Sequence, residues 1–259
     1  MTAGARWRSL RSNQRLPTYV VIAAVTVAVL VLAIRHHVLN AQTLIFLVVF
    51  VPAVICHEVS HGVVALWCGD DTAKRAGRLT LNPLKHIDPV GSIVVPIVLA
   101  LTWGYPFGWA KPVPVAVNRL RHPRNQSVLV SFAGPATNII LAAFAGVVFH
   151  ELVLHAWTPV PSCAAFMCTY DPSNFALVEQ IAFYFGVINI VLAVFNLIPI
   201  PPLDGSALVE RMLPVSALAG YYRIRMGFLL VIVFLVIVDR NLLTNLFGDL
   251  ENWYFRLSF

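Results

Sequence analysis

The chain has 259 residues, of which 59% are apolar and only 12% are charged. Soluble domains are about 45–50% apolar and about 25% charged, so this composition excludes an ordinary soluble protein and indicates a protein embedded in a bilayer. The net charge of +6 does not indicate a nucleic-acid partner, because the basic residues form short clusters between long apolar runs.

Five apolar runs are predicted to cross the bilayer as helices. The first, residues 17–34, is longer than the roughly 7–15 residues of a signal-peptide core, which predicts a retained span. The others cover residues 44–69, about 128–153, about 175–200 and about 218–238. The apolar run 92–102 is too short to span, so we expect a re-entrant element there.

The distribution of basic residues predicts the orientation. If the N-terminus is cytoplasmic, the segments 1–16, 70–125 and 203–226 contain every Lys and Arg except Arg35, Arg240 and Arg256. This is the positive-inside pattern. It predicts a multi-pass cell-membrane protein whose segment 154–174 is external.

Shorter elements are predicted between and after the spans. The cytoplasmic stretch 70–125 is punctuated by Pro and Gly, and within it residues 78–81 and 109–117 suggest extended segments. Residues 243–257 have apolar side chains at helical spacing, which predicts an amphipathic interfacial helix. Cys56 and Cys68 lie in an apolar run and are expected to be buried thiols, whereas a disulfide between Cys163 and Cys168 in the external loop is left open.

The second span contains three ionisable residues within five positions: His57, Glu58 and His61. On a helix, His57 and His61 lie one turn apart on the same face, so their imidazoles can bind one metal ion. Glu58 lies beside that face, where it can accept a proton from a water without being a ligand. Ionisable groups inside a membrane are energetically unfavourable and generally functional, so a zinc site is favoured over a polar cluster that only joins helices.

A zinc site with an open position needs one more protein ligand. Asp204 is the candidate, because it follows the fourth span in a segment where three prolines and a glycine break the helix. The orientation predicted above brings this segment and the inner half of the second span to the cytoplasmic side. From spacing alone, a simple turn at Asp204-Gly205 is an equally good interpretation.

Taken together, these residues resemble the site-2 protease family of intramembrane zinc metalloproteases, in its short form without an inserted peptide-recognition domain. The matching stretches occur in the family's order: His57-Glu58-Val59-Ser60-His61; Asn82-Pro83 with His86-Ile87-Asp88-Pro89-Val90-Gly91; Gly108-Trp109-Ala110-Lys111-Pro112-Val113-Pro114-Val115; Ala133-Gly134-Pro135-Ala136-Thr137-Asn138; and Asn196 through Asp204-Gly205. The resemblance implies that His57, His61 and Asp204 bind one Zn²⁺ and that Glu58 is the catalytic base. It also implies that the substrates are transmembrane helices of other proteins, cut within or near the bilayer.

Two asparagines are further candidates for the catalytic site. Asn138 and Asn196 lie within or at the edge of spans, and in the family such residues lie near the site. They could steady a substrate backbone or a developing oxyanion, although hydrogen bonding between helices is an equally good interpretation for Asn138.

The expected protein is therefore an all-α polytopic membrane metalloprotease with about five transmembrane helices, a re-entrant element and short extended cytoplasmic segments. It is expected to form a single domain over residues 1–259, with its catalytic core at about 43–210 and its active site nearer the cytoplasmic face. Residues 109–117 are expected to hold an unwound substrate by backbone pairing. A catalytically silent membrane scaffold and a zinc transporter are the alternatives, and the sequence leaves open whether copies assemble into a homo-oligomer.

Overall fold

The computed structural model describes residues 31, 41–88, 91–92, 95, 110–155, 175–214, 216–223, 227 and 240–258. The chain divides into two compact units. One unit comprises residues 1–44 and 87–111, and the other comprises residues 45–86 and 112–259. In the first unit, Asp88 and Ser92 form a turn in which the Ser92 amide donates to the Asp88 carbonyl at 2.8 Å. The rest of the predicted re-entrant element, apart from Val95, lies outside the described residues.

Three long apolar helices dominate the second unit. They are α2 (Ala41–Trp67, of which the first residues belong to the other unit), α5 (Pro123–Leu154) and α6 (Leu177–Leu197). Each is long and apolar enough to cross a membrane, which confirms the second, third and fourth predicted spans. Of the first and fifth predicted spans, the structure describes only residue 31, residues 218–223 and residue 227, all of them helical.

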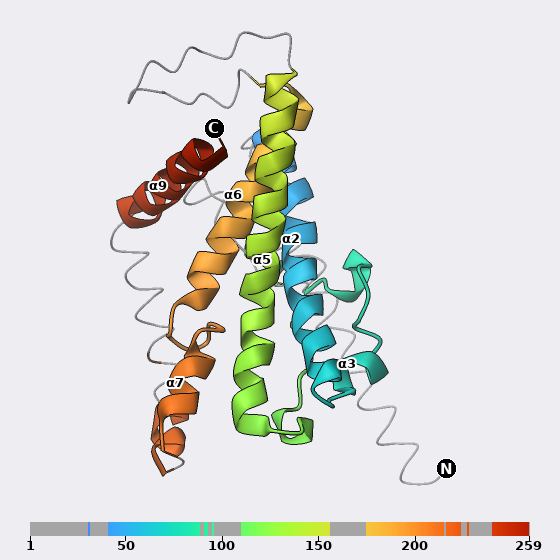
Figure 1. The fold of residues 1–259 in the computed structure, drawn as a ribbon, viewed down its shortest axis with the longest axis vertical. Coiled ribbons are helices and arrows are strands. Elements are labelled where there is room, and N and C mark those ends of the chain that lie inside the picture. Colours follow the sequence, from blue (N-terminus) through green and yellow to red (C-terminus); the bar gives the residue numbers. More distant parts are fainter. Residues whose placement is uncertain are drawn as a thin grey trace. The chain divides into compact units, whose positions relative to one another are not determined.

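Figure 1 shows the three helices side by side, and they pack through apolar side chains. Between α5 and α6, Phe149 of α5 and Phe183 of α6 lie with their ring centroids 5.1 Å apart and are both fully buried. Between α2 and α6, Val49 and Ala53 pack with Ile188. These contacts place the middle of α6 beside both of the other helices.

The ends of the helices follow from individual residues. Gly69 ends α2 with a φ of +108°, a left-handed conformation that glycine adopts readily. Pro123 begins α5 at a position where its missing N–H is not needed. Beyond Leu197 the chain has prolines at 199, 201 and 202, which cannot continue α6.

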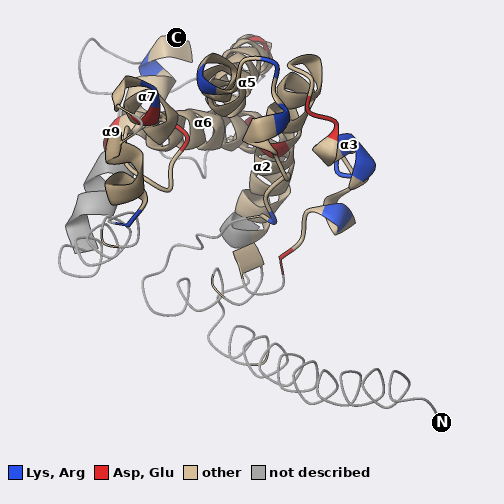
Figure 2. Ribbon diagram, turned by 90° about the horizontal axis from the view of Figure 1, so that it is seen from below, with Lys and Arg blue, Asp and Glu red and all other residues tan. Residues whose placement is uncertain are grey.

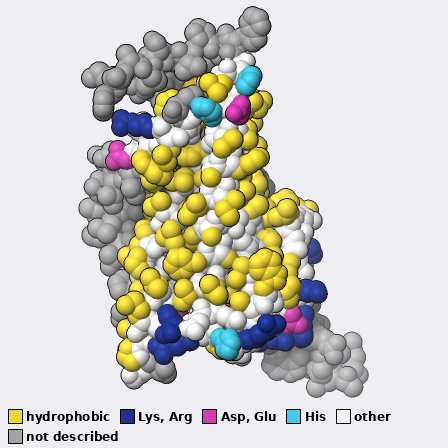
Figure 3. All heavy atoms as spheres, viewed as in Figure 1, with side chains coloured by type: hydrophobic (Ala, Val, Ile, Leu, Met, Phe, Trp, Pro, Cys, Tyr) yellow, Lys and Arg dark blue, Asp and Glu magenta, His cyan; other side chains and the backbone are white. Residues whose placement is uncertain are grey.

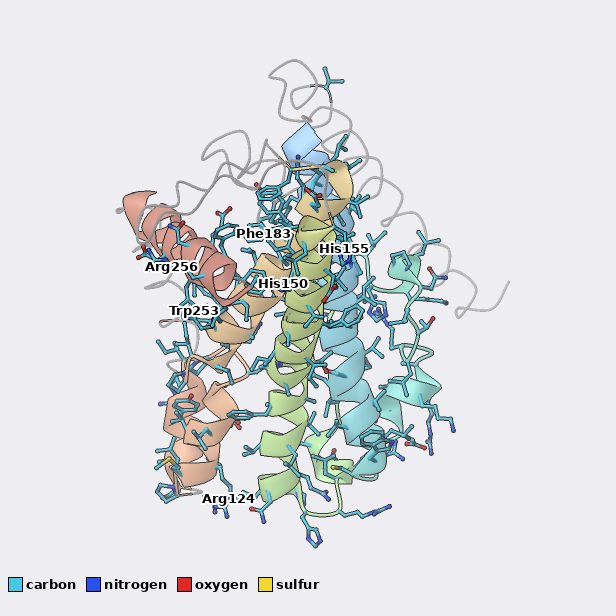
Figure 4. The ribbon with its side chains drawn as sticks, turned by 45° about the horizontal axis from the view of Figure 1, so that its top comes forward. Arg124, His150, His155, Phe183, Trp253 and Arg256 are labelled. Atoms are coloured by element: carbon cyan, nitrogen blue, oxygen red, sulfur yellow. The ribbon has the colours of Figure 1, made fainter. Side chains whose placement is uncertain are left out.

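The outer surface of the second unit is typical of a membrane protein. Large apolar side chains such as Ile140 and Phe144 of α5 are exposed, and Figure 3 shows that apolar side chains cover the middle of this face. Lys and Arg gather near α3 (Thr72–Arg75), the start of α5 and α7 (Ser206–Met212), as Figure 2 shows. In Figure 4, Arg124 lies at this basic end of α5, and His150 and His155 lie toward the opposite end.

The expected extended segments do not form strands: the part of the chain that the structure describes contains none. Residues 78–82 are irregular, and residues 110–116 are irregular up to the 3-10 turn Val117–Arg119. Strand pairing by residues 110–116 is unfavourable because Pro112 and Pro114 have no N–H to donate. In addition, Val113 and Ala116 donate their amides to carboxylates of this chain, so the segment offers few groups to a β-ladder.

The amphipathic helix predicted near the C-terminus is present as α9 (Arg240–Ser258). It packs against both α5 and α6. On α5, the Ala142 carbonyl accepts a hydrogen bond from the Tyr254 hydroxyl at 2.8 Å. A Cβ at Gly186 would overlap the Tyr254 ring, so this glycine makes room for the tyrosine. Trp253, by contrast, is half exposed, and Figure 4 shows it on α9 beside Arg256.

Cys56 in α2 and Cys68 directly after it are free thiols, and Cys68 is buried. This confirms the interpretation of Cys68 as a buried thiol, whereas Cys56 is only partly buried. Cys163 and Cys168 lie outside the described residues.

Candidate metal centre

The two histidines of α2 face the interior of the second unit. His57 and His61 are 6% and 9% exposed, and they lie on one face because they are one helical turn apart. Their ring centroids are 4.7 Å apart and the ring planes are nearly perpendicular, at 86°. This arrangement lets one nitrogen of each ring approach the same point.

The segment after α6 brings a carboxylate to the same point. The Gly205 amide donates to the Asn196 carbonyl at 2.6 Å, which turns the chain back toward the end of α6. A Cβ at Gly205 would collide with the carbonyls of Leu197 and Ile198, so only glycine fits this close approach. The turn places Oδ2 of Asp204 3.0 Å from His57 Nε2 and 3.3 Å from His61 Nε2.

These three donor atoms fit a zinc ion. They all lie within 4.8 Å of one another, and zinc–nitrogen and zinc–oxygen bonds of about 2.0–2.2 Å in a tetrahedron place ligand atoms about 3.3–3.6 Å apart. Burial raises the pKa of Asp204, but hydrogen bonds from His57 and His61 lower it to about 2, so the carboxylate is ionised. The group therefore supplies two imidazole nitrogens and one anionic oxygen, a donor set typical of zinc.

The opposite nitrogen of each imidazole is held by α5. Nδ1 of His57 lies 2.5 Å from Oδ1 of Asn138, and Nδ1 of His61 lies 2.6 Å from the carbonyl oxygen of Val130. Because a carbonyl oxygen can only accept, Nδ1–H of His61 is the donor. Partners of this kind fix the tautomer and the ring orientation of metal-binding histidines, leaving Nε2 for the metal.

Gly134 lies between these two partners on the same face of α5, four residues from each. A Cβ at this position would lie 2.5 Å from Cε1 of His57 and 2.6 Å from Nε2 of His61. Pro135 follows it inside the helix and has no N–H for the Ser131 carbonyl. The sequence analysis gave Gly134 no role, although a Gly-Pro pair inside an apolar span is a signal for a close approach of another element.

Glu58 is held at the edge of the site by the irregular segment 110–116. Its Oε2 accepts a hydrogen bond from the Val113 amide at 2.8 Å. The same segment is anchored farther along, where the Ala116 amide donates to the buried Asp70 carboxylate at 2.6 Å. The structure therefore provides Glu58 with a fixed backbone donor that spacing in the sequence could not reveal.

The two predicted asparagines occupy different environments. Asn138 is fully buried and contacts His57, whereas the Asn196 side chain donates to the Leu192 carbonyl of its own helix at 3.0 Å. A third asparagine, Asn189 of α6, is also fully buried and accepts a hydrogen bond from Asn138 at 2.6 Å. It was not among the residues predicted from the sequence, and its signal is an amide in the middle of the fourth span, within the apolar stretch 181–195.

The second unit combines apolar helices of membrane-spanning length with a donor group of two buried histidines and a partly buried aspartate, beside a glutamate. These features define a membrane protein with a metalloprotease-type centre. Comparison with known families agrees, since the model of peptidase family M50 matches residues 159–238, which include Asp204. Together with two relatives that are 31–32% identical to the chain over 69% of their own length, this match shows that the chain belongs to the site-2 protease family of zinc metalloproteases.

Curated relatives match longer stretches of the chain. The chain is 45% identical to "Putative zinc metalloprotease YwhC" of Bacillus subtilis over 158 residues, which cover 61% of this chain and 64% of the relative. It is 32% identical to "Putative zinc metalloprotease Rip2" of Mycolicibacterium smegmatis over 205 residues, 78% of this chain and 69% of the relative. The Mycobacterium tuberculosis protein of the same description is 31% identical over the same coverage. No solved structure matches.

Proposed function

We propose that this protein is an intramembrane zinc metalloprotease that hydrolyses peptide bonds within or near the transmembrane helices of other membrane proteins. The observation that carries the proposal is the convergence of His57, His61 and Asp204, with donor atoms 3.0–3.3 Å apart, inside a bundle of apolar helices. The catalytic core is residues 43–210, within the single domain expected from the sequence.

The roles of the residues around the centre follow from their positions. Bound zinc would supply Lewis-acid chemistry, lowering the pKa of a water and polarising the scissile carbonyl. Glu58, fixed by the Val113 amide, takes the proton of the attacking water and returns it to the leaving amine. Asn138 supports the reaction through His57, since its amide oxygen is occupied by that ring. Asn196 is proposed to steady the substrate backbone with its amide oxygen or its second N–H, since its other N–H donates to the Leu192 carbonyl.

A helical substrate hides its peptide bonds in intrahelical hydrogen bonds. It must therefore unwind before Glu58 and the metal centre can reach a scissile carbonyl. The segment expected to hold the unwound strand has its Val113 and Ala116 amides engaged, so we expect substrate contacts there to depend mainly on carbonyl groups and side chains.

Metal removal tests the proposed function. Purified protein in detergent or liposomes should contain one zinc per chain and cleave a membrane-embedded helical substrate. Chelation should abolish both, and added zinc should restore both. Asp204→Ala should weaken zinc binding severely, because the remaining two imidazoles make an incomplete site. A full zinc complement in this variant would eliminate Asp204 as a ligand, and zinc-loaded protein inactive on every membrane substrate would favour the scaffold or transporter alternatives.

We further propose five spans with a cytoplasmic N-terminus, so that the metal centre lies nearer the cytoplasmic face. The three described apolar helices and the basic end of α5 support this orientation. Reporters fused after residue 16, near residue 120 and near residue 215 should read cytoplasmic, and a reporter within 155–172 should read external. A cytoplasmic signal from the 155–172 loop would contradict the five-span arrangement.

A further inference from the structure

A chain of buried hydrogen bonds leads from the backbone of α6 to the metal centre. Nδ2 of Asn189 donates to the carbonyl of Phe185 at 2.8 Å, and Oδ1 of Asn189 accepts from Nδ2 of Asn138 at 2.6 Å. Oδ1 of Asn138 in turn lies 2.5 Å from Nδ1 of His57. Both asparagines are 0% exposed, so water cannot substitute for a lost partner.

The direction of every bond in this chain is determined at its first link. A backbone carbonyl only accepts, so the Asn189 amide must turn its NH₂ group toward Phe185 and its oxygen toward Asn138. Asn138 must then present its NH₂ group to Asn189 and its oxygen to His57. That oxygen only accepts, so the proton of neutral His57 lies on Nδ1. With zinc bound, the lone pair of Nε2 is therefore directed at the metal, whereas without zinc Nε2 lies 3.0 Å from the Asp204 carboxylate, which can only accept.

We propose that Asn189 is a positioning residue that fixes the tautomer of His57 through Asn138 and so makes Nε2 available to zinc. This inference rests on the metal centre of the proposed function, but it concerns a residue that touches neither the donor atoms nor the substrate. Without Asn189, the Asn138 amide loses the partner that distinguishes its oxygen from its nitrogen. A flipped Asn138 would point an N–H at His57 and favour the tautomer whose Nε2 is protonated, which cannot bind zinc.

Two substitutions separate hydrogen bonding from packing. Asn189→Leu has a similar volume but neither donates nor accepts, and outer partners of metal ligands typically contribute about 10–100-fold to affinity. We therefore expect the zinc dissociation constant of Asn189→Leu, measured by chelator competition, to rise by about that factor. Asn189→Asp presents an oxygen to Asn138 in either protonation state and should keep zinc affinity near that of the wild type. Val191→Ala, another buried position on α6, is the control for loss of packing.

The tautomer itself gives a readout independent of activity. In zinc-loaded protein with ¹⁵N-labelled histidine, the His57 resonances should indicate an Nδ1–H hydrogen-bonded to Asn138 in the wild type and in Asn189→Asp, and loss of that hydrogen bond in Asn189→Leu. Wild-type zinc affinity in Asn189→Leu would overturn the inference, as would an equal loss of zinc in Val191→Ala or in Asn189→Asp. A wild-type protein that binds no zinc would instead overturn the metal centre itself, and the inference with it.

Discussion

Replacing Glu58 with glutamine is expected to reduce proteolysis by about 10²–10⁴-fold, the usual contribution of general acid–base catalysis, while zinc and the fold are retained. Glutamine has the shape of glutamate, and its carbonyl oxygen can still accept the Val113 amide that holds Glu58 at 2.8 Å. It cannot take a proton from the attacking water. The loss should lie toward the upper end of the range, because the same carboxylate serves both the attack and the departure of the amine.

The measurement is hydrolysis of a membrane-embedded helical substrate by purified protein, with zinc determined on the same sample. Glu151→Gln is a matched control, because Glu151 lies near the far end of α5 with its side chain exposed, and its activity should equal that of the wild type. Glu58→Gln activity within about tenfold of wild type, with zinc retained, would remove Glu58 from the mechanism. Loss of zinc from this variant would show that Glu58 has a structural role.

Adding one methyl group at Gly134 should abolish zinc binding and, with it, activity. The Cβ of Gly134→Ala would lie 2.5–2.6 Å from both imidazoles, far inside the roughly 3.5–4.0 Å at which non-bonded carbon atoms pack. Either α5 moves away from α2 or the rings turn. Both responses break the contacts of Nδ1 of His57 with Asn138 and of Nδ1 of His61 with Val130, so the three donor atoms no longer converge.

Gly146→Ala on the same helix is the matched control. Its Cβ would approach only the Tyr254 hydroxyl at 3.2 Å and Ser258 at 3.4 Å, in a region that includes none of the metal-centre residues. Alanine favours a helix interior over glycine by up to about 1 kcal/mol at both positions, so helix propensity cannot explain a difference between them. Metal analysis should find zinc in Gly146→Ala and none in Gly134→Ala. A full complement in Gly134→Ala would contradict the close packing of α5 against the histidines.

The local features of the protein were predictable from the sequence because they depend on neighbours within a turn or two. Runs of apolar residues predicted α2, α5 and α6 to within a few residues of their ends. The spacing of His57 and His61 placed both imidazoles on one helical face. Asp204 was a weaker prediction, since its spacing fitted a turn equally well, and only the family resemblance favoured it as a ligand.

Residues 110–116 form no strand in the structure, and the reason lies in distant parts of the chain. The stretch around residues 109–117, punctuated by Pro and Gly, suggested an extended edge, but the amides of Val113 and Ala116 are taken by Glu58 and Asp70, which lie 55 and 46 residues away in the chain. The sequence shows how many backbone N–H groups a segment can donate. It does not show which distant carboxylates accept hydrogen bonds from them.

By itself, the sequence determined the membrane class, three described spans, the ligand-bearing face of α2 and the identity of the catalytic glutamate candidate. Only the tertiary structure decided what lies opposite that face: the Val130 carbonyl, the gap at Gly134, and the Asn138–Asn189 pair. Helical periodicity fixes which residues of one helix share a face. The residues of a second helix that meet this face depend on where the two helices cross and how each is rotated, and those quantities are set by packing over the whole bundle.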